Sequence, residues 1–385
     1  MGGILVLNSG SSSVKFAVFD GHLEQILSGS ATEIGGASVL KITSKGKSSE
    51  ETSASLPNHS AALSAILEVV HKTGIDVTDL AGVGHRVVHG GASLQASIGV
   101  DAAVIKEIQR CSDLAPLHNP HNLAAIEALS DLAPDLLQVA CFDTAFHATN
   151  PEVAQRYALP DSPEMKNFRR YGFHGISYQG LVNTLADRAP DGVPDRLLAL
   201  HLGNGASLCA IKSGQSVATT MGYSPLEGLT MGTRCGGIDG NLVLRLAEQF
   251  GVDETSQILN RKSGLLGLGG ISDMRALHAS GTDAAQFAID HFCYWAVRHA
   301  GSMIAAMGGL DGIAFAGGIG ENDALVRHKI LSGLTWLDTG FDTKANENNA
   351  FRIDAVGSSI PIWIVEAEEE KTIAAETQRL LKQYD

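Results

Sequence analysis

The sequence is poor in charged residues, and cationic residues are scarcer than anionic ones. Charged residues make up 18% and hydrophobic residues 44% of the 385 residues. This excludes a disordered chain and favours a well-buried protein of two domains. There are 28 Lys and Arg against 42 Asp and Glu, a net charge of −14. That balance argues against nucleic acid or an anionic membrane as a partner, because both require a positive field.

Cysteine is also sparse. Five cysteines are scattered along the chain without a C-x-x-C pair, which excludes a disulfide framework or a zinc site and indicates a reducing compartment. The N-terminus has no basic region, and its first apolar run stops at Leu7, so it does not read as a signal peptide. No uncharged apolar stretch reaches the roughly 20 residues that span a bilayer. We therefore expect a cytoplasmic protein without a membrane partner.

The first structured stretch predicts a β-hairpin. Apolar runs at residues 4–7 and 16–19 flank a tip of Gly and Ser that lies between Asn8 and Lys15, and this alternation of strand formers and breakers is typical of a hairpin. A tip of small residues exposes backbone N–H groups and hydroxyls, and Lys15 adds one cation, which together suit a phosphate chain. An ordinary Gly/Ser turn is the alternative for this stretch alone, and the Walker spacing is absent.

The same design recurs at residues 197–211, where two apolar runs flank the tip Gly203-Asn204-Gly205. Two such hairpins about 195 residues apart indicate two halves of similar architecture. A nucleotide held between two phosphate-binding hairpins is a hypothesis that neither hairpin supports alone.

Three further stretches carry candidate chemistry. Asp143 follows an apolar strand at residues 136–141, where α/β proteins place ligands, although it could equally cap the next segment. The irregular loop 224–237 contains a single cation, Arg234, and long loops of this kind are often functional. Residues 317–322 form a glycine turn between a strand at 311–316 and a helix, an arrangement that binds anions.

Helices and loops follow from periodicity and capping. The two prolines in residues 115–122 predict a rigid, non-helical loop, either a site or a helix connector. We expect helices at residues 60–71, 101–114, 177–187, 241–250, 283–307 and 366–383.

Seven motifs in order resemble the acetate kinase family, within the actin, sugar kinase and chaperone fold group. The resemblance covers nearly the whole chain and rests on residues 8–15, 85–91, 142–147, 170–175, 201–205, 231–234 and 318–322. It implies two similar α/β domains of the actin-like ATPase (ribonuclease H-like) type with an interdomain nucleotide cleft. The first domain would comprise residues 1–146 plus 371–385, and the second residues 147–370.

The resemblance also implies an activity, reversible phosphoryl transfer from ATP to acetate that gives ADP and acetyl phosphate. Mg²⁺ would be the cofactor, with Mn²⁺ as its substitute, and the chain would form a homodimer. Asn8 and Glu369 would hold the metal. The catalytic residues implied are Asp143, His174, Arg234 and His118. The acid would be held by Arg86 and by an acetyl pocket of Val88, Leu117, Phe173 and Pro225. The nucleotide-binding residues implied are Lys15, Ser11, Ser13, His201, Leu202, Gly203, Asn204, Gly205, Asp273, Met274, Arg275, Gly318, Ile319, Gly320, Glu321 and Asn322.

These residue types suit the chemistry. Phosphoryl transfer needs alignment and charge neutralisation more than covalent participation. A carboxylate acceptor, with a reference pKa of about 4, is already deprotonated at neutral pH. We therefore interpret Asp143 as organising Mg²⁺ or its waters instead of removing a proton. Arg86 and Arg234 would offset the repulsion between two anions, because guanidinium stays charged and can bind two oxygens.

The chain departs from the family pattern at a few positions. Gly240 stands where proline is usual, Gly237 replaces an acidic residue, His121 replaces a proline, and Tyr178 stands where histidine is common. None of these is a residue with an implied catalytic role, but two lie close to Arg234 in sequence. They put the rate and the acid preference in question, and not the reaction class.

The sequence leaves three alternative functions open. Propionate or butyrate could replace acetate, since one methylene discriminates by only about 1–3 kcal/mol. A sugar kinase of the same fold group would transfer to a hydroxyl and need a general base. A non-catalytic nucleotide-binding or chaperone-like protein would have no reason to place Arg86, His174 and Arg234 beside phosphate.

Overall fold

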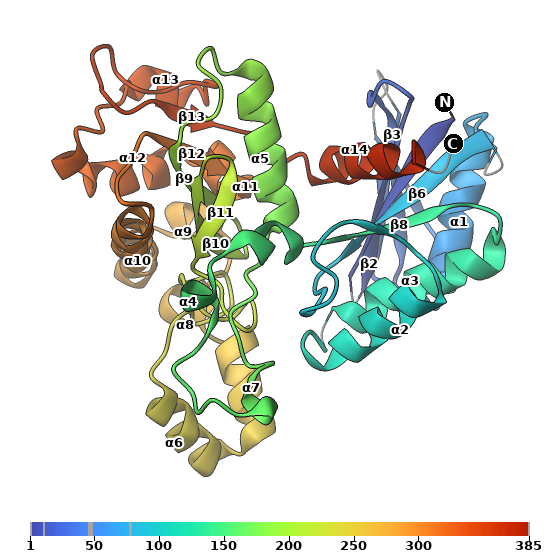
Figure 1. Ribbon diagram of the computed structural model, residues 1–385, viewed down its shortest axis with the longest axis horizontal. Coiled ribbons are helices and arrows are strands. Elements are labelled where there is room, and N and C mark those ends of the chain that lie inside the picture. Colours follow the sequence, from blue (N-terminus) through green and yellow to red (C-terminus); the bar gives the residue numbers. More distant parts are fainter. Residues whose placement is uncertain (1, 11, 45–48, 77–78, 117, 384–385) are drawn as a thin grey trace. The chain divides into compact units, whose positions relative to one another are not determined.

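Two β-sheets organise the chain, one in each of two units (Figure 1). The computed structural model describes residues 2–10, 12–44, 49–76, 79–116 and 118–383. The first unit is Met1–Phe146 with Glu368–Asp385, and the second is His147–Ala367. Among the described helices, none combines the length and the apolar character needed to cross a membrane.

The first sheet has the strand order β5-β4-β3-β2-β1-β6-β8-β7. Its strands are β1 (Gly3–Ser9), β2 (Ser13–Phe19), β3 (Gln25–Thr32), β4 (Val39–Ser44), β5 (Glu50–Ser53), β6 (Leu80–Val87), β7 (Ile98–Gly99) and β8 (Gln138–Phe142). β1 and β2 pair antiparallel with Asn8 opposite Lys15, which confirms the predicted hairpin. β1, β6 and β8 run parallel to one another, so their carboxyl ends lie at one edge.

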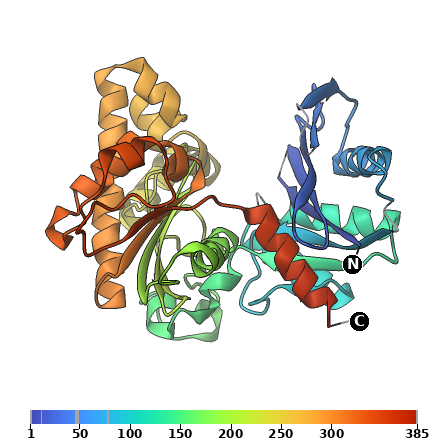
Figure 2. The same ribbon diagram turned by 90° about the horizontal axis from the view of Figure 1, so that it is seen from above.

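The helices of the first unit cover both faces of its sheet. Helices α1 (His59–Lys72) and α3 (Asn119–Leu132) pack on one face, where Leu5, Leu7 and Val83 form a core with residues of both helices. The C-terminal helix α14 (Glu369–Leu381) packs on the other face against β6 and β1 (Figure 2). A Cβ on Gly84 would lie 2.4 Å from Thr377 Oγ1. Glycine at this strand position therefore allows the close approach of α14.

The second sheet repeats the central part of the first. Its strands are β9 (Arg196–Leu202), β10 (Ala206–Lys212), β11 (Gln215–Thr219), β12 (Gly312–Ala316) and β13 (Ile362–Ile364), in the order β11-β10-β9-β12-β13. This order matches β3-β2-β1-β6-β8 in the first sheet. In both sheets the first three strands of the order are antiparallel neighbours, and the last two strands run parallel to the third. The recurrence of architecture predicted from the two hairpins is confirmed.

Two long helices lie on opposite faces of the second sheet. Helix α5 (Gly175–Arg188) contacts β9 and β12, and helix α10 (Asp283–Met307) contacts β9, β10 and β11 (Figure 1). The predicted bounds of α10 match the structure. The remaining α-helices are α2 (Ala102–Arg110), α4 (Glu152–Gln155), α6 (Gly240–Phe250), α7 (Val252–Arg261), α8 (Gly264–Gly269), α9 (Met274–Ser280), α11 (Gly317–Asn322), α12 (Ala324–Ser332) and α13 (Thr343–Glu347).

The prediction for residues 115–122 is wrong in its second half. Residues 115–122 were expected to be a non-helical loop, but α3 begins at Asn119 with Pro120 in its first turn. Proline is tolerated there because the first N–H groups of a helix have no intrahelical acceptor. The proline thus starts a helix that extends to Leu132.

Candidate functional site

The candidate residues of the first unit gather where the parallel strands end. In the register of the sheet, Leu7 pairs with His85 and Arg86 pairs with Cys141. Asn8, Arg86 and Asp143 therefore follow one another across the carboxyl ends of β1, β6 and β8, where α/β sheets bind ligands. Because side chains alternate along a strand, Arg86 lies on the same face as Gly84, which α14 covers. The first residue of α14, Glu369, completes the group.

These four residues form one polar cluster around the Arg86 guanidinium. Arg86 Nε and Nη2 donate to the two carboxylate oxygens of Asp143 at 3.0 and 2.7 Å. Arg86 Nη1 lies 3.4 Å from Asn8 Oδ1 and 3.8 Å from Glu369 Oε2. Both planar edges of the guanidinium thus face oxygen atoms. We call these residues the Arg86 cluster.

Burial and the neighbouring charges shift the pKa values of Asp143 and Arg86 in opposite directions. Asp143 is 2% exposed, and burial raises its pKa above the ordinary range although the Arg86 guanidinium lowers it. Burial disfavours the charge on Arg86, but Asp143 and Glu369 outweigh this and raise the pKa of Arg86. Arg86 therefore remains a cation under all ordinary conditions. Asp143 occupies the Nε and Nη2 edge of Arg86, and the Nη1 edge faces Asn8 and Glu369.

Two buried asparagines that we had not assigned a role hold the backbone beside the cluster. Asn119 exchanges hydrogen bonds with His89, through its Oδ1 at 3.1 Å and its Nδ2 at 2.9 Å. Asn122 accepts from the Val88 N–H at 3.1 Å and donates to the Ser9 carbonyl at 2.6 Å. The first turn of α3 thus ties the ends of β1 and β6 together. The sequence signal that could have revealed this role is the presence of two asparagines, three residues apart, within residues 115–122.

The other candidates of the first unit lie around this edge. Ser13 belongs to β2, and Lys15 is exposed on that strand. The tip of the hairpin is held by His59, whose ring nitrogen contacts the Gly10 carbonyl at 2.7 Å. Val88 is buried, and His118 lies close enough to Asp143 to lower the pKa of that carboxyl. Ser11 and Leu117 are outside the described residues.

A divalent cation has oxygen ligands available in the Arg86 cluster. Magnesium prefers oxygen, and it is usually held by one or two carboxylates plus substrate phosphates and waters. Asn8 Oδ1 and Glu369 Oε2 meet that description, and both face the same guanidinium nitrogen. Within the described ranges there is no group of three or more His, Cys, Asp or Glu that could hold a metal. The donor set therefore fits a metal that arrives with its phosphates.

The second unit brings His174, His201 and Arg234 to the tip of the β9–β10 hairpin. The rings of His174 and His201 stack with their centroids 4.1 Å apart. A Cβ placed on Gly205 would lie 3.2 Å from His174 Nε2 and 2.9 Å from Arg234 Nη2. Both nitrogens thus reach the same point above Gly205, and only a glycine leaves that point open. We call these residues the Gly205 cluster.

Backbone contacts place Arg234 in this cluster. The Gly232 N–H donates to the Asn204 carbonyl at 3.0 Å, so the loop lies against the hairpin tip. Arg234 Nη1 donates to the Pro225 carbonyl at 2.6 Å. Burial lowers the pKa of Arg234, and no carboxylate of the described chain forms an ion pair with it. Arg234 is therefore a partly buried cation that no carboxylate of the described residues neutralises.

His174 adopts an uncommon backbone conformation. It precedes helix α5 with a φ of 59°, in the left-handed region that few residues other than glycine adopt. Such conformations cost free energy and are found disproportionately at functional sites. The preceding Phe173 is 1% exposed, and its carbonyl contacts the ring of the buried His147 at 2.9 Å. The contact between the Phe173 carbonyl and the buried His147 ring thus holds the backbone next to His174 in place.

A second glycine turn lies beside the tip of the β9–β10 hairpin. Ala316 at the end of β12 pairs with His201, and the backbone then enters α11 at Gly317, whose φ is 77°. A Cβ on Gly317 would lie 2.7 Å from the Leu202 carbonyl. Residues 202–205 and 317–322 are therefore adjacent. We had expected a turn before the helix, but helix α11 starts at Gly317 itself.

Two charged residues of this region have structural partners. Glu321 accepts from the backbone N–H groups of Gly317 and Ala367, both at 2.9 Å. Arg327 is 0% exposed and donates to the carbonyls of Gly320 and Asn346. Arg327 was not singled out from the sequence, because nothing local distinguishes it from a surface arginine. Both residues hold the shape of the α11 turn.

The remaining nucleotide candidates lie at the start of α9. Asp273 caps this helix by accepting from the Ala276 N–H at 2.9 Å, and the Arg275 side chain is 91% exposed. A Cβ on Gly232 would lie 3.4 Å from the Ser272 carbonyl, which places the segment near the Arg234 loop. His278 on α9 contacts Asp323 after α11 at 2.9 Å.

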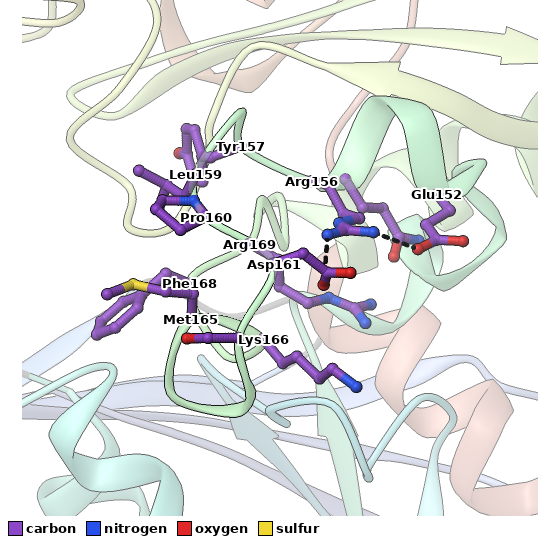
Figure 3. A pocket seen from close by; sticks show the side chains of 12 residues that line it. Glu152, Arg156, Tyr157, Leu159, Pro160, Asp161, Met165, Lys166, Phe168 and Arg169 are labelled. Carbon is purple, nitrogen blue, oxygen red and sulfur yellow. Dashed lines mark hydrogen bonds and ion pairs between the residues drawn. The ribbon is translucent and has the colours of Figure 1, made fainter.

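A hollow of about 400 Å³ lies in the second unit along residues 152–169 (Figure 3). Tyr157 lines this hollow and connects it to the loop 224–237, which carries Arg234. Its hydroxyl donates to Glu227 and accepts from the Tyr223 N–H at 3.0 Å. Burial and the Glu227 carboxylate raise the pKa of Tyr157 to about 12. Tyr157 and Glu227 thus order the segment that carries Pro225, a role the sequence did not reveal.

Comparisons with known proteins agree on one family. Residues 3–375 match the Acetokinase family. The chain is 43% identical to an acetate kinase of Rhodopseudomonas palustris, over 98% of this chain and 98% of that protein. It is 41% identical to an acetate kinase of Campylobacter jejuni, over 98% and 99%.

Solved structures agree as well. A propionate kinase of Francisella tularensis superposes with a TM-score of 0.92 at 35% identity, over 98% of this chain and 99% of that one. An acetate kinase of Porphyromonas gingivalis gives a TM-score of 0.91 at 35% identity, over 99% and 100%. The predicted fold, two-domain α/β of the actin-like type, is confirmed.

Proposed function

The chain belongs to the acetokinase family, and from that premise we propose how its residues transfer the terminal phosphoryl group of ATP to acetate with Mg²⁺. It is a phosphotransferase whose acceptor is a carboxyl group. Acetate is the proposed acid because the relatives at 41–43% identity are acetate kinases. Propionate and butyrate are the competing acids.

The observation that carries the proposal is the charge of the partly buried Arg234, which no described carboxylate neutralises. A partly buried cation that no described carboxylate neutralises favours an anion beside it, and the point that Arg234 Nη2 and His174 Nε2 share above Gly205 is where that anion would lie. A phosphoryl group in transfer spreads negative charge over three oxygens and needs donors of this kind. We assign Arg234 and His174 to the stabilisation of that charge.

The neighbouring turns supply nucleotide contacts. Gly203, Gly205 and Gly318 carry no side chain, and a Cβ placed on Gly318 would meet nothing within 4 Å, so phosphates can approach the backbone closely. We assign Lys15, Ser13 and the segment 273–275 to the same nucleotide. Glu321 contributes to nucleotide binding indirectly, because its carboxylate holds the backbone at Gly317 and Ala367.

The Arg86 cluster serves the acid and the metal. Arg86 binds the carboxylate of the acid, and Val88, Phe173 and Pro225 provide apolar contacts for its methyl group. Asn8 and Glu369 hold Mg²⁺, which when bound neutralises phosphate charge. Asp143 keeps Arg86 oriented through its two hydrogen bonds, and His118 adds positive charge beside it. No general base is needed, since the acid is already ionised.

We extend the proposal to the two units and to assembly. The two units correspond to two domains of the family type, and the protein is a cytoplasmic homodimer. The cysteines that the structure describes form no disulfide, which suits a reducing compartment. Helix α6 buries none of its residues, and its Leu242, Leu244 and Phe250 are 47–64% exposed. A second copy of the chain would cover such a surface. Sedimentation analysis of the purified protein tests this, and a monomer at micromolar concentration would contradict it.

The activity is tested by trapping the product. The protein is incubated with ATP, Mg²⁺ and acetate, propionate or butyrate, and hydroxylamine converts any acyl phosphate to a coloured hydroxamate. We expect hydroxamate with all three acids and the highest kcat/KM for acetate. The Arg234→Ala variant provides the blank. ADP formation without hydroxamate would contradict carboxylate transfer, and sugar-dependent ADP formation would support a hydroxyl acceptor.

A further inference from the structure

Two histidines lie beside the tip of the β1–β2 hairpin. His59 is the first residue of helix α1, and His121 lies in the first turn of α3. Both residues are half-buried, and their rings stack with centroids 5.3 Å apart and planes 21° from parallel. Neither histidine has a role in the proposed function, and His121 stands where the family pattern has proline.

His59 binds the hairpin at Gly10. Its Nε2 lies 2.7 Å from the Gly10 carbonyl oxygen, 49 residues earlier in the chain. A carbonyl oxygen has lone pairs but no hydrogen, so the ring nitrogen must be the donor. The start of α1 thus holds one end of the hairpin turn through a hydrogen bond whose direction is fixed.

Gly10 is held at both of its backbone polar groups. Its carbonyl accepts from His59, and its N–H donates to the Ser13 carbonyl at 2.7 Å. A Cβ on Gly10 would lie 3.4 Å from Ser13 Oγ, so the Ser13 hydroxyl lies beside this backbone. The carbonyl of the preceding Ser9 is bound by Asn122 of α3 at 2.6 Å. Side chains from two helices therefore bind two consecutive carbonyls at the end of β1.

His121 acts on the ring of His59. Burial and the neighbouring His59 lower the pKa of His121, so the His121 ring is neutral at neutral pH. Offset-stacked aromatic rings attract one another, and a stacked neighbour limits the rotation of the His59 side chain. The stack therefore keeps the His59 Nε2–H directed at the Gly10 carbonyl.

We infer that His59 is a positioning residue for the β1–β2 hairpin and that stacking on His121 holds its ring in place. The inference rests on the proposed function for the ligand, the phosphates of ATP, and on the contacts above for the hairpin itself. Donors that are already in place bind a phosphate chain better than donors that must first be ordered, because ordering consumes binding free energy. By fixing Gly10, His59 keeps Ser13 in the position assigned to nucleotide binding.

The first experiment measures the order of the hairpin in the full chain without substrates. Exchange of single backbone N–H groups with heavy water is followed by ¹H–¹⁵N NMR. In His59→Phe, which keeps a ring for the stack but removes the donor, the Gly10 N–H should exchange about tenfold faster. The N–H groups of Leu5 and Leu7 in β1 should keep their rates. An unchanged Gly10 rate would overturn the inference, and so would an equal rise at Leu5 and Leu7, which indicates a general loss of stability.

The second experiment measures the Kd for ATP with Mg²⁺ by calorimetry. His59→Phe should raise this Kd about tenfold, the effect of one hydrogen bond, and leave the KM for acetate within about twofold. His59→Gln, whose amide can donate to the same carbonyl, should bring the Kd and the Gly10 exchange rate back to within about threefold of the unmodified protein. His121→Ala should raise the Kd about threefold. His71→Phe, at a 67% exposed side chain near the other end of α1, is the matched control and should change neither quantity.

These results separate the inference from the proposed function. Equal Kd values for His59→Gln and His59→Phe would overturn the inference, because the hydrogen-bond donor would then have no effect. Faster Gly10 exchange with an unchanged Kd would overturn it as well. If the unmodified protein binds no ATP, the proposed function fails, while the Gly10 exchange rate still decides whether His59 orders the hairpin.

Discussion

Arg86 binds Asp143 through two parallel hydrogen bonds, with Nε 3.0 Å from Oδ1 and Nη2 2.7 Å from Oδ2. The pair joins the ends of two adjacent parallel strands, and the Asp143 side chain is only 3% exposed. A bidentate ion pair at this depth is oriented by the sheet itself. It leaves the Nη1 edge of Arg86 facing Asn8 and Glu369.

Removing Arg86 should destabilise the protein as well as weaken acid binding. In Arg86→Ala, the buried Asp143 carboxyl loses its partner and must either carry an unpaired charge or take up a proton, and breaking a buried pair in this way costs about 3–5 kcal/mol. The free energy of unfolding in urea measures this loss, and the KM for acetate should rise. The control is Arg196→Ala, which breaks an equally bidentate pair with Asp311 at 34–35% exposure. There we expect about 1 kcal/mol or less, and equal losses would contradict burial as the cause.

Arg234→Ala should reduce turnover by about a hundredfold or more while the protein stays folded. Loss of one donor to developing charge in a water-poor site costs roughly 3–4 kcal/mol of barrier. Removing a partly buried cation that forms no ion pair with the described carboxylates should not lower the free energy of unfolding much. The assay is the initial rate of hydroxamate formation, with circular dichroism for folding. Arg245→Ala, at an exposed arginine of α6, is the matched control. Near-normal turnover would remove Arg234 from the mechanism.

Gly205→Ala should inactivate the protein without unfolding it. The added methyl group would lie 2.9 Å from Arg234 Nη2 and 3.2 Å from His174 Nε2. Both atoms are near the ends of side chains that can move away, so the free energy of unfolding should change by less than about 1 kcal/mol. Their shared point would then be filled, and kcat should fall at least about tenfold. Gly301→Ala, where a Cβ meets nothing within 4 Å, should leave kcat unchanged. Full activity of Gly205→Ala would exclude the shared point as the phosphoryl site.

Buried histidines should make the protein sensitive to mild acid. Burial lowers the pKa of His85 and of His147 to about 4, from 6.5 in the unfolded chain. As pH falls below 6.5 the unfolded state binds protons first, so the stability contributed by each neutral ring is fully present above 6.5 and is lost as pH falls toward 4. The loss approaches about 3 kcal/mol per histidine.

Urea unfolding between pH 7 and 4.5 measures this acid sensitivity. His85→Gln, which keeps an amide donor for Gln138 Oε1, should flatten the dependence, whereas His22→Gln at an exposed histidine should not. A dependence that is the same in both variants would contradict this assignment.

Much of the architecture was determined by local sequence. The hairpin β1–β2 follows from two apolar runs around a tip of residues that do not favour strands. The recurrence of this pattern at β9–β10 predicted that the second sheet would repeat the first. Helix α1 begins after Asn58, and the Asn58 side chain caps the helix by accepting from the Ala61 N–H at 2.9 Å. Such features depend on residues within a few positions of each other, so their physics can be read from the chain alone.

The site contacts were decided by the tertiary structure. Arg86 and Asp143 are 57 residues apart, and their pairing required the parallel register of β6 and β8. The role of Asn122 depends on the Ser9 carbonyl, 113 residues away, and the buried hydroxyl of Tyr178 lies 2.6 Å from Ser207 Oγ on β10. A hydroxyl or amide carries the same local signal whether it meets water or a buried partner. Only the packing of distant segments excludes water and selects the partner, and that is why these roles were absent from the sequence.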